Sequence, residues 1–244
     1  MSNNYLLLWF EAPLQTWGAD SKFGRRDTLP FPTKSGVLGL VLCAMGASGP
    51  QNELLAKLNS GALQIASYVR SRPGVDGEAL EKINMEPLLR DFHMVGSGYD
   101  DKKRWERLLI PKTSEGKAAV GAGSSAGAKM TYRYYLQDAR FAIVWEVPED
   151  MAQMLADALQ NPVFDLYFGR KNCVPSARIF EGFYATAEEA WQKASIIANE
   201  KLLLEDFRVL DGEHEGDMMT LNDVPIQFGE VKKYRDRRVT KVPS

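Results

Sequence analysis

The chain has 244 residues, of which 45% are hydrophobic, so it can form one large domain or two small ones around a buried core. Its formal net charge of −2 excludes a uniformly basic nucleic-acid-binding protein, and any surface for anions must therefore be a local basic patch. The N-terminus has no basic segment before its short apolar run, and no stretch is long enough to span a membrane. We therefore expect a cytoplasmic protein without membrane contact, whose two cysteines, Cys43 and Cys173, are free.

The first part of the sequence predicts strands and short helices. Residues 5–12 are almost wholly apolar, as in a central strand, and Pro13 is expected to end this strand. Thr33 can cap a helix that contains the apolar residues 37–42 and stops at the segment GASGP. Further along, we expect a short helix over Gln51–Leu58 and strands over Leu63–Val69 and Leu88–Val95.

Residues 96–135 differ from the rest of the chain. They have strand-like ends and a centre, Val120–Ala128, that is rich in Gly, Ala and Ser. Such a centre has too little apolar surface to order itself by burial. We therefore expect a long hairpin that projects from the domain.

The second half predicts a strand over Phe141–Val147, an amphipathic helix in PEDMAQMLADALQNP and a last strand over Phe180–Ala185. An acidic helical segment, AEEAWQKASIIANEKLLLED, follows Thr186 and leads into short strands. This order fits an α+β fold of the ferredoxin-like kind, with one antiparallel sheet carrying two helices on one face. We assign this domain to residues 1–185 and a smaller, mainly β region to residues 186–244.

The sequence lacks the common catalytic motifs, including the P-loop, a GxGxxG turn, CxxC, HExxH and GxSxG. Two histidines and two cysteines are too few for a closed zinc site, so we expect no metal and no cofactor. His93 suits metal-free RNA cleavage as a general acid or base, with Tyr99, Lys102 and Lys103 nearby in sequence. An ordinary residue on the polar face of a strand explains His93 equally simply, and we prefer that interpretation.

Basic residues gather in several short segments that also contain aromatic residues. One cluster near the first predicted helix and another in the expected hairpin each contain four basic residues and one acidic residue. The segments KMTYRYY and YFGRKNCVPSARIF contain further basic residues. Basic groups neutralise phosphates while aromatic rings stack on bases, so this mixture favours single-stranded RNA. The alternative is that the charges form solvated faces and the rings belong to the core.

The predicted helix start could hold a phosphate through Thr33, Lys34, Ser35 and its free backbone N–H groups. Gly36 and Gly39 interrupt this helix at a cost of about 1 kcal/mol each relative to Ala. We expect close strand-to-helix packing to explain Gly39 and keep the approach of a ligand as an explanation for Gly36. The C-terminal segment EVKKYRDRRVTKVPS is expected to be a charged edge strand, with binding to nucleic acid or to an acidic subunit as alternatives.

Several of these segments, taken in order, resemble the CasD family, the fifth Cas protein of type I-E CRISPR Cascade complexes. They are APLQTWG, GRRDTLPFPTKSGVLGLVLCAMG, RDFHMVG, YRYYLQDARF and YFGRKNCVPSARIF, and they run over most of residues 5–185. The resemblance implies a RAMP protein with a ferredoxin-like, RRM-related domain, a thumb hairpin at about residues 96–132 and a small C-terminal β region.

The resemblance also implies a non-catalytic subunit that caps the 5′ handle of the CRISPR RNA in antiviral defence. Its implied partners are the CasC backbone subunit, the large CasA subunit and, through the assembled complex, target DNA. Related type I-C proteins cleave repeat RNA themselves, whereas type I-E members leave this step to CasE, so a metal-independent endoribonuclease using His93 is one alternative and a pure protein scaffold another. The clusters and the resemblance together give these expected RNA-binding residues: Lys22, Arg25, Arg26, Thr33, Lys34, Ser35, Gly36, Lys102, Lys103, Arg104, Arg107, Lys129, Arg133, Arg170 and Lys171.

Overall fold

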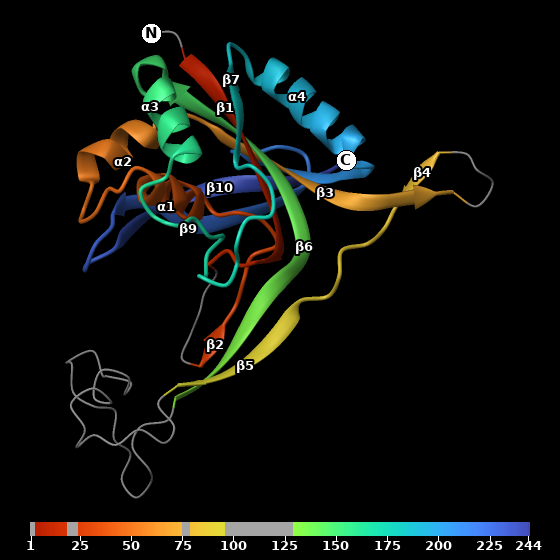
Figure 1. Ribbon diagram of the computed structural model, residues 1–244, viewed down its shortest axis with the longest axis horizontal. Coiled ribbons are helices and arrows are strands. Elements are labelled where there is room, and N and C mark those ends of the chain that lie inside the picture. The colour runs from red at the N-terminus through yellow and green to blue at the C-terminus, as the bar shows by residue number, and fades with distance from the viewer. Residues whose placement is uncertain (1–2, 19–23, 75–78, 96–128) are drawn as a thin grey trace, which may run out of the picture.

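A computed structural model describes residues 3–18, 24–74, 79–95 and 129–244 (Figure 1). Within these ranges the helices are α1 (Lys34–Ala44), α2 (Asn52–Leu58), α3 (Glu149–Gln160) and α4 (Ala187–Glu200). The strands are β1 (Asn3–Gln15), β2 (Arg25–Arg26), β3 (Leu63–Pro73), β4 (Leu80–Lys82), β5 (Leu89–Val95), β6 (Lys129–Pro148), β7 (Phe180–Tyr184), β8 (Leu203–Asp211), β9 (Asp217–Gln227) and β10 (Lys233–Pro243). None of the described helices is long and apolar enough to cross a membrane.

The main sheet has the strand order β7-β1-β6-β3-β8-β10-β9, and neighbouring strands are antiparallel. Along the chain, β1, α1, β3, β6, α3 and β7 follow a strand-helix-strand-strand-helix-strand order, interrupted by short elements. The predicted mixed α+β class with an antiparallel sheet is confirmed. The strands after residue 185 continue the same sheet, since β8 pairs with β3, and the division of the chain at that residue stays a prediction.

Helices cover both faces of this sheet, which explains why β1 is apolar without alternation. Leu6, Leu8 and Phe10 point into a core that also holds buried residues of α1, α2 and α3. Leu7 and Trp9, on the opposite face of β1, pack in a second core with residues of α4. The sequence predicted two helices on one face, but it did not predict that α4 covers the other.

Two predicted boundaries and one predicted strand position were wrong. β1 continues past Pro13, which lies between the paired residues Ala12–Ala139 and Leu14–Gln137. β7 no longer pairs with β1 at this point, so the missing N–H of the proline costs no hydrogen bond on that side. α4 ends earlier than expected because Leu202 takes a left-handed φ of 55°, and the following leucines belong to β8. β10 is not an edge strand, since it lies between β8 and β9.

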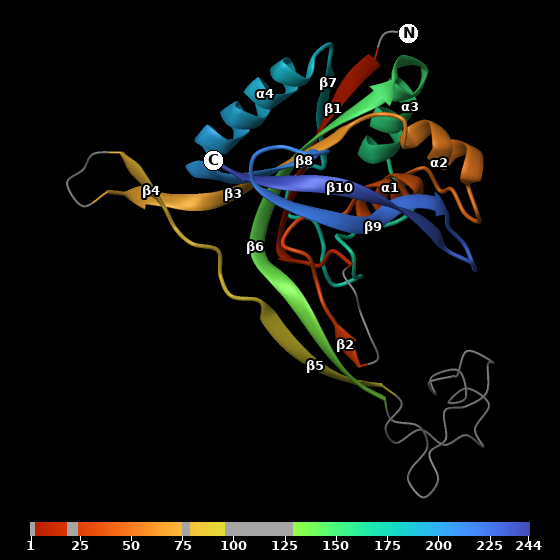
Figure 2. The same ribbon diagram turned by 180° about the vertical axis from the view of Figure 1, so that it is seen from behind.

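A three-stranded ribbon extends away from the helices (Figure 1 and Figure 2). Its three strands are β5, the first part of β6 and β2. The first part of β6 lies in the middle, with β5 paired on one side and β2 on the other. The strand pairs run from Leu89–Tyr135 to Val95–Lys129. The expected hairpin begins beyond this ribbon, and its residues 96–128 lie outside the described part of the chain.

Candidate nucleic-acid interface

Arg170 joins the loop after α3 to the ribbon. Its Nη1 donates a hydrogen bond to the carbonyl of Tyr134 at 3.1 Å, and its Nη2 donates one to the carbonyl of Arg26 at 3.0 Å. The guanidinium also lies 4.5 Å from the centroid of the Tyr135 ring. A planar guanidinium suits these three contacts, because its nitrogens donate from separate positions while its face lies near the ring. Arg25, Arg26 and Arg170, which come from distant parts of the sequence, therefore form one arginine cluster.

Arg25 is an exposed member of the arginine cluster. Its side chain is 66% exposed, although its Nε lies 2.8 Å from the Asp27 carboxylate. Exposed ion pairs of this kind contribute little, so Asp27 can readily be exchanged for a phosphate. The guanidinium also lies 4.9 Å from the centroid of the Tyr134 ring, which places an aromatic surface beside the charge.

One face of the ribbon carries exposed aromatic rings next to arginine. Phe92 and Tyr132 are 52% and 45% exposed, and their ring centroids are 5.5 Å apart. The guanidinium of Arg90 lies 5.6 Å from the Tyr132 ring centroid. Exposed rings flanked by cations are the kind of surface on which bases stack. Arg90 and Phe92 were absent from the expected RNA-binding residues, although their alternation along a predicted strand could have placed them on this face.

His93 lies on β5, and Asp91 is the one described residue whose side chain pairs with it. The distance from His93 Nδ1 to Asp91 Oδ2 is 3.7 Å, longer than an ordinary hydrogen bond, and both side chains are exposed. Tyr99, Lys102 and Lys103, its expected neighbours, lie outside the described residues.

The start of α1 is held by groups of the chain itself. The Thr33 hydroxyl accepts a hydrogen bond from the Gly36 N–H at 3.1 Å, and the Lys34 N–H donates to Asp223 Oδ2 at 2.7 Å. The Lys34 side chain is buried and donates from Nζ to the carbonyl of Gly61 at 3.2 Å. Burial lowers the pKa of Lys34. Lys34 therefore faces the interior, and a carboxylate already occupies one of the N–H groups expected to bind phosphate.

The structure reverses the expected reasons for the two glycines of α1. A Cβ atom at Gly36 would lie 2.9 Å from Cε3 of Trp17, so close packing requires this glycine. For a Cβ atom at Gly39, the nearest contact in the described part of the chain would be Phe228 Cζ at 3.9 Å. The packing explanation proposed for Gly39 is therefore wrong, and that explanation belongs to Gly36.

The remaining expected residues are spread along the ribbon and its flanks. Arg133 pairs with Arg26 in the register of β6 and β2, Lys171 is exposed beside Arg170, and Lys129 begins β6. Ser35 is half-buried, and its hydroxyl lies 3.3 Å from that of Thr33. Five others lie outside the described residues: Lys22, Lys102, Lys103, Arg104 and Arg107. In the described part of the chain, no three His, Cys, Asp or Glu side chains gather as metal ligands do.

Comparison with known proteins gives consistent results. Residues 5–240 match the family model described as CRISPR-associated protein (Cas_Cas5). The CRISPR system Cascade subunit CasD of Escherichia coli (strain K12) is 29% identical over 182 residues, which are 73% of this chain and 70% of that protein.

Two solved structures share the fold. A chain described as part of a CRISPR RNA-guided surveillance complex has a TM-score of 0.67 and 26% identity, with 98% of this chain and 90% of that chain covered. A second, described as the crystal structure of a Cas protein, has a TM-score of 0.52 and 22% identity, with coverages of 98% and 95%, and shows the fold alone. Since the family model covers residues 5–240, the chain belongs to the Cas5 family of CRISPR-associated proteins.

Proposed function

We propose that this protein is the Cas5 subunit of a type I-E Cascade complex and that it holds the 5′ handle of the CRISPR RNA without cleaving it. The family match, the likeness to E. coli CasD and the likeness to a chain of an RNA-guided surveillance complex support the assignment to such a complex. On this proposal its partners are CRISPR RNA, the CasC and CasA subunits and, through the assembled complex, target DNA, all in the cytoplasm.

The observation that carries the RNA-binding part is the arginine cluster. Arg170 fixes β2 against β6, so the exposed Arg25 is presented beside the Tyr134 ring on a rigid support. Cations arranged in advance next to aromatic rings can bind phosphates and bases together at a low cost in ordering.

The strand order β7-β1-β6-β3 with α1 and α3 on one face supports a ferredoxin-like domain within this proposal. The ribbon of β2, β5 and β6 would then be the base of the thumb, which continues into the predicted hairpin at about residues 96–132. The strands after residue 186 would be the small C-terminal β region.

The salt dependence of RNA binding tests the proposal. Labelled CRISPR repeat RNA is titrated with the protein in EDTA at several salt concentrations, and the same samples are run on native and denaturing gels. Losing two phosphate contacts in the Arg25→Ala/Arg26→Ala variant should weaken binding and flatten the slope of log K against log salt by about 1.4. The control variant, Arg72→Ala/Arg238→Ala, removes the same net charge from two exposed ion pairs elsewhere and should keep the native slope.

Two outcomes would contradict this proposal. Equal slopes for the native protein and the Arg25→Ala/Arg26→Ala variant would mean that the arginine cluster does not contact RNA phosphates. Cleavage of the RNA at one site in EDTA, lost in His93→Ala, would show a metal-independent nuclease instead of a non-catalytic subunit.

A further inference from the structure

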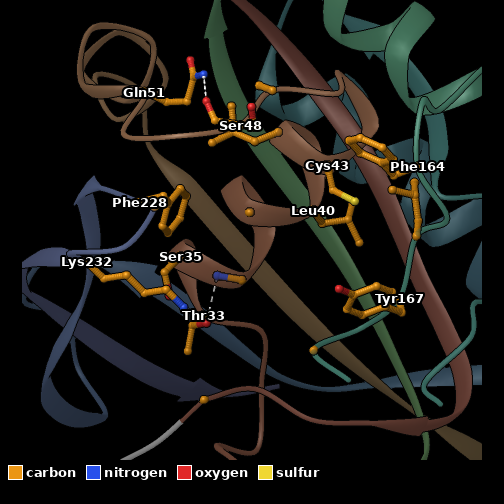
Figure 3. A pocket seen from close by; sticks show the side chains of 18 of the residues that line it. Thr33, Ser35, Leu40, Cys43, Ser48, Gln51, Phe164, Tyr167, Phe228 and Lys232 are labelled. Atoms are coloured by element: carbon orange, nitrogen blue, oxygen red, sulfur yellow. Dashed lines mark hydrogen bonds between the residues drawn. The ribbon is translucent and has the colours of Figure 1, made fainter. Parts of the chain in front are cut away.

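A pocket of about 650 Å³ lies beside α1 (Figure 3). The residues of the arginine cluster do not line it. Its lining comes from α1, from the loop after α3 and from the turn between β9 and β10. Gly18 and Gly169 also line it, and Gly169 is the immediate neighbour of Arg170. The pocket and the arginine cluster are therefore adjacent parts of one surface.

Gly39 points to an occupant that the described residues do not provide. It lies inside α1, where glycine is less favourable than alanine, yet among the described residues the nearest atom outside the helix to an added Cβ is Phe228 Cζ at 3.9 Å. Packing therefore explains Gly36, which is pressed against Trp17, but not Gly39. A glycine that lines an open pocket allows a ligand to approach the helix backbone closely.

The walls of the pocket suit a flat, aromatic ligand. Phe228 and Tyr167 reach it from separate loops and lie on opposite sides of it in Figure 3. The Phe228 ring is held in place by Tyr234, whose ring centroid lies 6.4 Å away. The polar groups of the lining include the Ser35 hydroxyl and the Gln51 amide, which can pair with the edge of a base.

The charge around the pocket favours a polyanion over an ordinary protein segment. The chain contains 32 Asp and Glu residues, yet none of the described residues that line this pocket is acidic. The exposed Lys232 is the one Lys or Arg among them. The lining itself therefore offers a phosphate no carboxylate, although Asp165 lies between the lining residues Phe164 and Leu166 and, in addition to burial, helps to raise the pKa of Cys43.

We propose that this pocket, with Gly39 at its wall, takes one unstacked nucleobase of the single-stranded RNA whose phosphates the arginine cluster binds. The inference rests on the proposed function, because it needs RNA to be the ligand of the neighbouring cluster. The pocket would then be a specific site for one base, next to the arginine cluster that binds the phosphates.

A double-mutant cycle between RNA and protein tests this inference. The probes are CRISPR repeat RNAs that each carry one abasic residue, placed at successive positions. For the native protein, one position should weaken binding about tenfold when its base is missing, as expected for the loss of a stacked base. Gly39→Leu, which places a bulky side chain at the pocket wall, should weaken binding of the intact RNA about tenfold and abolish the effect of the abasic residue at that one position.

Two further variants serve as a control and as a replacement for Gly39→Leu. Gln192→Leu adds a leucine to the exposed surface of α4 and should bind every RNA as the native protein does. If Gly39→Leu does not fold, Tyr167→Ala takes its place, since it removes a wall of the pocket and should act on the same RNA position.

The outcomes separate this inference from the proposed function. If no abasic residue matters more than another while Arg25→Ala/Arg26→Ala still weakens binding, the base pocket is wrong and the proposed function stands. If neither change matters, the proposed function fails as well. If Gly39→Leu binds RNA normally but no longer assembles with the other Cascade subunits, the pocket holds a protein side chain, and the inference is overturned.

Discussion

Replacing Gly39 by alanine should stabilise the free protein, whereas the same replacement at Gly36 should destabilise it. In α1, alanine is favoured over glycine by about 1 kcal/mol, and at Gly39 the new methyl group would make only an ordinary contact, 3.9 Å from Phe228 Cζ. At Gly36 the methyl group would lie 2.9 Å from both the Trp17 ring and the Thr33 hydroxyl. Such overpacking costs about 1–3 kcal/mol.

The net effect at Gly36 is expected to be a loss of about 1–2 kcal/mol, because the displaced Thr33 hydroxyl also caps α1. Thermal unfolding followed by circular dichroism measures both variants. In a chain of this size, 1 kcal/mol corresponds to a shift in Tm of about 2–4 °C, so the two variants should move Tm in opposite directions. If Gly39→Ala lowers Tm as much as Gly36→Ala does, the space beside Gly39 is filled in the free protein, and the argument for an open pocket is refuted.

Three further predictions concern pH, thiol reactivity and one loop glycine. Burial raises the pKa of Glu11 and of Glu205, but hydrogen bonds and nearby cations outweigh it and hold each pKa below its usual value. The stability that these two carboxylates give is present above a pH of about 4.3 and is lost as the pH falls through their lower folded-state pKa. The free energy of unfolding measured with urea should therefore change less between pH 7 and pH 3 in Glu205→Gln than in the native protein. Burial raises the pKa of the Cys43 thiol, which lines the pocket, so iodoacetamide should label it slowly at pH 7.5, and intact repeat RNA should slow labelling several-fold further. Gly169→Ala should reduce RNA affinity and the effect of the critical abasic residue together, because a Cβ atom there would lie 1.9 Å from the Thr16 carbonyl oxygen, and the same titrations measure both.

The regular elements could be predicted from the sequence wherever local chemistry determines them. The Thr33 cap, for example, sets the start of α1 by accepting a hydrogen bond from the N–H of Gly36, only three residues further along the sequence. The end of α4 was missed because it depends on a left-handed backbone at Leu202, a residue type that rarely adopts that conformation. The position of α4 on the second face depends on how distant strands pair, and periodicity within one segment carries no information about that.

The candidate site was predictable in composition but not in arrangement. The sequence identified Arg26 and Arg170 as basic residues, but their contact joins positions 144 residues apart. Lys34 was expected to help bind a phosphate at the helix start, but Asp223, which is 189 residues away in sequence, accepts a hydrogen bond from its backbone N–H. In each case the contacting residue is distant in sequence and is brought close only when the chain folds. The local pattern therefore predicted the residue types but could not predict which residues they contact.

One short loop links the two parts of the proposed RNA surface. Tyr167 lines the pocket, Arg170 holds the ribbon, and Gly169 lies between them with a φ of +92°. The loop is fixed to the end of β1 by a hydrogen bond from the Thr16 N–H to the carbonyl of Phe168 at 3.1 Å. Because backbone contacts set the position of this loop, the pocket and the arginine cluster keep a constant spacing before RNA arrives. Binding then pays little to order the protein, and a bound strand meets phosphate contacts and a base site at a fixed separation. A change in this loop should therefore lower both the salt slope of binding and the effect of the abasic residue, whereas a change confined to the arginine cluster should lower only the salt slope and a change confined to the pocket only the effect of the abasic residue.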